Sequence, residues 1–129
     1  PYLFSTSIPP MVAGAAIEMF NLIDKTNDLQ DKLHNNTAYF VEKMKAAGFD
    51  IKPTQSAICA VMLYDAKLSQ DFAAALQEEG IYVTGFYYPV VPKGQARIRV
   101  QVSAAHEKEH LDRCIAAFTK IGKNLGVIK

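Results

Sequence analysis

The fold of this chain is decided by one stretch, YVTGFYYPVVPKGQARIRVQVS, which runs from Tyr82 to Ser103. Its ends are rich in β-branched and aromatic residues, and its centre carries proline and glycine. This pattern predicts two strands, residues 81–88 and 96–103, joined by a turn. A chain that reverses direction in this way forms an antiparallel pair.

The second of these strands separates its side chains by type. Ile98, Val100 and Val102 fall on one face, because alternate residues of a strand point to opposite sides of the sheet. Arg97 and Arg99 share the other face with Gln101 and Ser103. Two guanidinium groups with their planar forks make a site suited to a carboxylate. The alternative is an ordinary solvated sheet face, which this pattern also fits.

The rest of the chain predicts helices around a small sheet. Residues 11–23 are apolar on most sides and predict a helix that is interrupted near residues 24–28. A second helix follows, with Leu29, Leu33, Phe40, Met44 and Ala47 at helical spacing before Gly48. Residues 57–63 predict a central strand, 68–79 a helix and 107–125 a last helix. The order predicts an α+β fold, a small mainly antiparallel sheet covered by helices.

Length and composition suit one domain of 129 residues. Within it we expect an opening segment, 1–28, that packs on something outside this chain, and a compact part, 29–129. The chain begins without Met, in an apolar, strand-like segment, and therefore resembles a piece cut from a longer protein.

Charge and cysteine content exclude several classes of function. A net charge of +1 without a basic block predicts neither nucleic-acid binding nor attachment to an anionic membrane. No apolar run approaches the ~20 residues that span a bilayer, and no signal peptide is evident. Cys59 and Cys114 lie in apolar surroundings without CxxC spacing, which favours buried, reduced thiols and a cytoplasmic protein.

The segment His106-Glu107-Lys108-Glu109-His110 matches the zinc motif HExxH. That chemistry needs both histidines on one helix face and a third ligand further along. No His or Glu follows His110, and the segment falls at a predicted helix start. We therefore expect no metal site and interpret the match as a helix N-terminus.

Several segments together resemble the C-terminal part of the glycine C-acetyltransferases, also called 2-amino-3-ketobutyrate coenzyme A ligases. They are PYLFSTSIPP at 1–10, GIYVTGF at 80–86, YPVVPKGQARIR at 88–99, SAAH at 103–106 and IGKNLGVI at 121–128. This group is a branch of the α-oxoamine synthases, which depend on pyridoxal phosphate and have fold type I. The resemblance extends over the whole chain.

The resemblance implies roles for two residues. It assigns Arg99 to the substrate carboxylate, with Arg97 as a possible support, and Ser5 to the cofactor phosphate of the neighbouring subunit. The lysine that forms the Schiff base lies upstream in the family, and Lys93 is a poor substitute. We therefore expect this chain alone to be inactive and to bind no pyridoxal phosphate.

The implied reaction joins glycine and acetyl-CoA to 2-amino-3-oxobutyrate and CoA, or runs in reverse during threonine breakdown. The implied assembly is a homodimer. Two alternatives stay open: a stand-alone module that binds small anions through Arg97 and Arg99, and a sister synthase with another acyl donor or amino acid.

Overall fold

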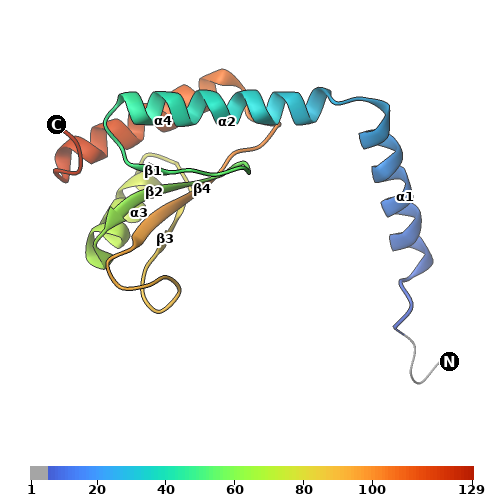
Figure 1. Ribbon diagram of the computed structural model, residues 1–129, viewed down its shortest axis with the longest axis horizontal. Helices are drawn as coiled ribbons and strands as arrows, with labels where there is room; N and C mark the ends of the chain where they lie inside the picture. Colours follow the sequence, from blue (N-terminus) through green and yellow to red (C-terminus); the bar gives the residue numbers. More distant parts are fainter. Residues whose placement is uncertain (1–5) are drawn as a thin grey trace.

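The structure is a computed structural model and describes residues 6–129. The described residues form four helices and a four-stranded sheet, and three of the helices pack on the sheet, which confirms the predicted α+β class (Figure 1). The helices are α1 (Pro10–Lys25), α2 (Asp28–Ala46), α3 (Ala66–Glu78) and α4 (Lys108–Asn124). The strands are β1 (Ile51–Lys52), β2 (Ile58–Tyr64), β3 (Thr84–Phe86) and β4 (Ala96–Gln101).

The sheet has the order β1-β2-β4-β3, and every neighbouring pair is antiparallel. The two strands predicted from the deciding stretch are the paired strands β3 and β4, with Phe86 opposite Arg97 and Thr84 opposite Arg99. A loop of residues 87–95 joins them and contains a cis peptide bond between Tyr88 and Pro89. The predicted hairpin is therefore confirmed.

One face of the sheet is covered by α2, α3 and α4. The core joins Cys59, Val61 and Leu63 of β2 to Ile98 and Val100 of β4, all of them buried. Helix side chains complete this core, and the largest of them are Phe40, Met44, Phe72, Leu76 and Phe118. Because all these residues share one face, the opposite face of β2 and β4 points away from the helices that form the core.

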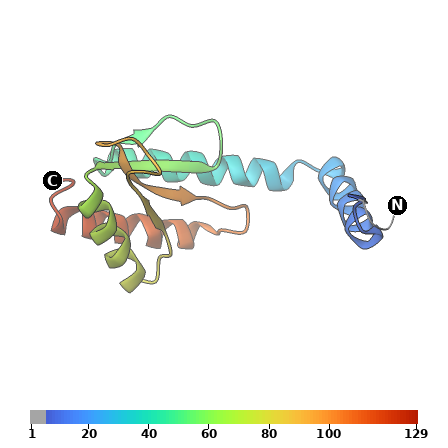
Figure 2. The same cartoon turned by 90° about the horizontal axis from the view of Figure 1, so that it is seen from below.

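Helix α1 stands apart from the compact part in both views (Figures 1 and 2). Pro10 begins it at a position where proline fits the first turn, and none of its residues is buried. The chain leaves helical geometry at Thr26 and re-enters it at Asp28, as the polar residues near position 25 predict. The division into 1–28 and 29–129 stays a prediction, because it concerns contacts outside this chain.

Three details of the prediction were wrong. Strand β3 covers only Thr84–Phe86 instead of 81–88, and β4 ends at Gln101 instead of Ser103. The two-residue strand β1 was not predicted, because so short a segment shows no alternation. Leu29 is exposed, since the first turn of α2 extends beyond the sheet that its later turns cover.

Candidate functional site

The candidate site is the face of β4 that points away from the helices. Arg97 is half-buried and Arg99 is exposed, while Ile98 and Val100 between and beyond them are buried. Residues two apart on a strand have Cα atoms ~7 Å apart. The two arginine side chains therefore leave the same face of one strand.

Neighbouring strands set the surroundings of each arginine. Arg99 lies between Ala60 of β2 and Thr84 of β3, and Arg97 lies between Met62 and Phe86. Ala60 and Thr84 are small, and the Arg99 side chain is exposed. The Arg99 guanidinium lies over the Phe86 ring, with its carbon 5.5 Å from the ring centroid. This cation–π contact holds the guanidinium near the sheet.

Neither arginine forms an ion pair with another of the described residues. Of the ion pairs that the structure forms within residues 6–129, none involves Arg97 or Arg99. A guanidinium keeps its charge at all physiological pH values and offers five N–H donors. Two such groups without an acidic partner among residues 6–129 form a cationic surface, and a carboxylate is a chemically suitable ligand for it; that it binds one stays a prediction.

Strand β3 supports this face through an unusually close contact with α3. A Cβ atom at Gly85 would lie 2.8 Å from the main-chain oxygen of Ser69, which is fully buried. Only glycine allows β3 to approach α3 so closely. Gly85 therefore sets the distance between β3 and α3, and with it the positions of Thr84 and Phe86 beside the arginines.

Two other residues were considered from the sequence, Ser5 and Lys93. Ser5 lies outside the described residues, so its role at a cofactor phosphate stays a prediction. Lys93 lies in the loop between β3 and β4, and its ammonium is 5.1 Å from the centroid of the Tyr88 ring.

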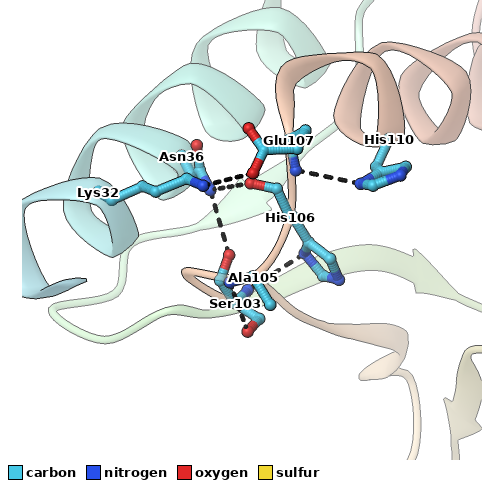
Figure 3. Close-up of polar contacts among 7 residues, drawn as sticks. All are labelled: Lys32, Asn36, Ser103, Ala105, His106, Glu107 and His110. Carbon is cyan, nitrogen blue, oxygen red and sulfur yellow. Dashed lines mark hydrogen bonds and ion pairs between the residues drawn. The ribbon is translucent and has the colours of Figure 1, made fainter.

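The HExxH segment forms a helix start, as we interpreted it. Helix α4 begins at Lys108, so His106 precedes the helix and does not share a helix face with His110. Each ring Nδ1 accepts a hydrogen bond from a main-chain N–H, that of Ser103 at 3.2 Å and that of Glu107 at 3.1 Å (Figure 3). Within residues 6–129, no three His, Cys, Asp or Glu side chains gather as a metal site.

Two supporting residues were missed from the sequence. Phe86 could have been found by extending the register of the hairpin, which places it opposite Arg97 on the arginine face. Asn36 of α2 donates hydrogen bonds to the main-chain oxygens of Ser103 and His106, at 3.1 and 2.8 Å (Figure 3). Asn36 therefore holds the segment that follows β4. The one signal for this contact in the sequence is that Asn36 lies one helical turn before the core residue Phe40.

The cysteines fit the sequence interpretation. Both thiols are free; Cys59 is buried and Cys114 is half-buried. Burial raises the pKa of the Cys59 thiol and raises that of Cys114 to about 11. Both therefore stay protonated at neutral pH and are poor nucleophiles. Among residues 6–129, no helix is both long enough and apolar enough to cross a bilayer.

Comparison with known proteins defines the family and the fold of this chain. The aminotransferase class I and II family matches residues 1–118, and the chain belongs to that family. Within it, 2-amino-3-ketobutyrate coenzyme A ligase of Escherichia coli K12 is 54% identical over 99% of this chain and 32% of its own length. This similarity confirms the resemblance to that branch.

Other relatives belong to neighbouring branches. An 8-amino-7-oxononanoate synthase of Petrotoga mobilis is 46% identical over 99% of this chain and 33% of its own length. The structure of S. paucimobilis serine palmitoyltransferase K265A with bound PLP–myriocin aldimine matches with a TM-score of 0.88 and 29% identity. That match covers 97% of this chain and 32% of the other. The fold is that of a part of a fold-type I pyridoxal-phosphate enzyme, and the chain spans about a third of the relatives' length.

Proposed function

We propose that this chain forms part of an acyltransferase that joins glycine to acetyl-CoA, giving 2-amino-3-oxobutyrate and CoA. The observation that carries the proposal is the pair of arginines on the open face of β4, within a chain 54% identical to a 2-amino-3-ketobutyrate coenzyme A ligase. In this proposal Arg99 binds the glycine carboxylate, and Arg97 adds positive charge beside it.

The geometry around Arg99 suits this role. A carboxylate accepts two parallel hydrogen bonds from one guanidinium, which fixes its plane as well as its position. The Phe86 ring on one side and the small Ala60 and Thr84 beside the strand leave the fork free for such a ligand. Fixing the carboxylate orients the α-carbon of glycine, which contributes to catalysis through positioning.

Pyridoxal phosphate is the cofactor of the whole protein, as its family and its relatives indicate. When bound, it withdraws electrons from the amino-acid α-carbon and so makes the α-proton removable. This chain suits binding of the amino-acid substrate, because the guanidinium groups of Arg97 and Arg99 have no ion-pair partner among residues 6–129 and match a carboxylate. Ser5 would donate to the cofactor phosphate from a neighbouring subunit of a homodimer.

The proposal also specifies the acyl group, which is acetyl, and the compartment, which is the reducing cytoplasm. The amino-acid sequence of the hairpin loop supports acetyl transfer, and the free thiols Cys59 and Cys114 support a reducing compartment. A sister synthase is the second candidate, because an 8-amino-7-oxononanoate synthase is 46% identical over the same length. A stand-alone anion-binding module is the third, since the arginine face lies open in this chain.

An activity assay separates these candidates. The protein that carries this chain together with the remaining part of the relatives' length would be given glycine, alanine or serine with acetyl-CoA or longer acyl-CoAs. Release of CoA would be followed with a thiol reagent. The proposal expects the largest kcat/KM for glycine with acetyl-CoA. A preference for a longer acyl-CoA or for another amino acid would favour a sister synthase, and absence of turnover with every pair would favour the module.

A further inference from the structure

A cavity of about 450 Å³ lies beside the sheet at the end of β4, where Gln101 but neither Arg97 nor Arg99 lines it. It lies between residues 80–83, the end of β4 and the first turns of α4. The β3–β4 ladder stops where Thr84 faces Arg99, so residues 81–83 do not pair with the end of β4. The cavity lies where that ladder would have continued, which explains why the predicted strand was too long.

The walls of this cavity are mainly apolar. Val83 lines one side, Val100 and Val102 line the sheet side, and Leu111 and Cys114 line the helix side. The two sheet valines and Leu111 are buried, so they belong to the stable core. The walls are therefore preformed, and an apolar body of ligand size would gain from filling the space.

Three polar side chains, from α4 and from the segment just before it, reach the cavity and can donate hydrogen bonds. They are His106, His110 and Arg113. Each histidine Nδ1 already accepts a main-chain hydrogen bond (Figure 3), so the neutral ring carries its proton on Nε2. The two rings are 6.4 Å apart between centroids. Arg113 uses one N–H on the Glu79 main-chain oxygen, at 3.0 Å, and has further N–H groups.

The charge of the cavity has one sign. None of the described residues that line it is Asp or Glu, while Arg113 is a permanent cation. The carboxylates of Glu79 and Glu107 nearby are engaged by Lys120 and Lys32, at 2.5 and 2.6 Å. An anion therefore meets donors and positive charge here, and no lining carboxylate opposes it.

We propose that this cavity binds a small organic anion, with a carboxylate at His106, His110 and Arg113 and an apolar body between Val83 and Leu111. This site is separate from the one proposed for glycine, because neither Arg97 nor Arg99 lines the cavity. It therefore goes beyond the proposed function and does not depend on it.

The test is an NMR titration of the chain with 3-phenylpropionate, and with 3-phenylpropionamide as its uncharged counterpart. A ligand of this size should bind with a dissociation constant on the order of a millimolar. The expected result is a shift of the ring signals of His106 and His110 and of the methyl signals of Val83 and Leu111. The amide should bind about tenfold more weakly, because it loses the charge-assisted hydrogen bonds.

Two variants locate the site. Arg113→Gln should weaken binding of the acid about tenfold. Lys123→Gln makes the same charge change on the same helix outside the cavity and should leave the affinity unchanged. Val83→Phe fills the cavity from a segment outside the sheet and should abolish binding of both compounds. The spectrum of each free variant shows whether it has folded.

Three results with the chain alone would overturn the proposal. They are equal affinity for the acid and the amide, shifts centred on Arg97 and Arg99, and equal effects of Arg113→Gln and Lys123→Gln. The titration is repeated on the longer protein that carries this chain. Binding by the chain alone but not by the longer protein would mean that another part of that protein fills the cavity, which also overturns the proposal.

Discussion

Substitution of Gly85 by alanine tests how β3 is held beside the arginine face. The new Cβ atom would lie 2.8 Å from the Ser69 oxygen and 3.2 Å from its carbonyl carbon. These are main-chain atoms of α3, and the helix is anchored there because the Ser69 N–H donates to the Asp65 oxygen at 3.1 Å. The helix therefore cannot yield easily, and β3 has to move instead.

The expected cost follows from this overlap. Overpacking by one methyl group at a fixed contact costs about 1–3 kcal/mol of unfolding free energy. With a urea slope of about 2 kcal/mol per molar, the midpoint of unfolding should fall by about 1 M. The amides of Thr84 and Phe86 should also exchange faster with deuterium, because the displaced strand pairs less well with β4.

Gly14→Ala is the matched control. It makes the same chemical change in the middle of α1, where a Cβ atom would meet nothing within 4 Å. It should leave the midpoint of the core unchanged while favouring the helix itself. An unchanged midpoint and unchanged amide exchange in Gly85→Ala would refute the account of how β3 is positioned.

Three further predictions concern the core, the start of α4 and the opening helix. Phe118→Ala should lower the free energy of unfolding, measured in urea, by about 3–5 kcal/mol, because this fully buried ring contacts Phe40, Phe49 and Phe72. The control Phe20→Ala, at a site that is 65% exposed, should leave the free energy of unfolding almost unchanged. A hydrogen bond from Lys32 lowers the pKa of Glu107, so the ion pair between Lys32 of α2 and Glu107, just before α4, should persist above the ordinary pKa of Glu and be lost as the pH falls through the lowered pKa. Lys32→Gln should raise the pKa of Glu107 in an NMR titration, and no change would contradict this. The exposed apolar side chains of α1, such as Met11, Ile17 and Phe20, should make the chain self-associate in sedimentation experiments. A chain without residues 1–25 should remain monomeric. A full chain that stays monomeric at high concentration would contradict the prediction.

The sequence predicted the fold well where a periodic pattern was long. The alternation at Arg97 to Val102 and the spacing of Phe40 and Met44 each correspond to a buried face in the structure. Prediction failed where tertiary contacts decide. Val83 lies in a β-branched run, yet it lines a cavity instead of pairing with β4, and no local pattern indicates that divergence.

The candidate site was predictable in part. The type and spacing of Arg97 and Arg99 were sufficient to place both on one face, because a strand has a fixed period. The contact of Arg99 with Phe86 depends on the register between two strands, and the need for glycine at position 85 depends on its distance to α3. Such distances between elements are properties of the packed structure and have no local signature in the sequence.

The central proposal, that Arg99 binds the glycine carboxylate, is tested most directly by comparing two conservative variants of the longer protein. Arg99→Lys and Arg97→Lys both keep the charge, but lysine loses the planar fork. Loss of a charge-assisted hydrogen bond costs about 1.5–3 kcal/mol, so kcat/KM for glycine should fall about 10- to 100-fold in Arg99→Lys and much less in Arg97→Lys. A larger fall in Arg97→Lys, or equal falls in both, would contradict the assignment.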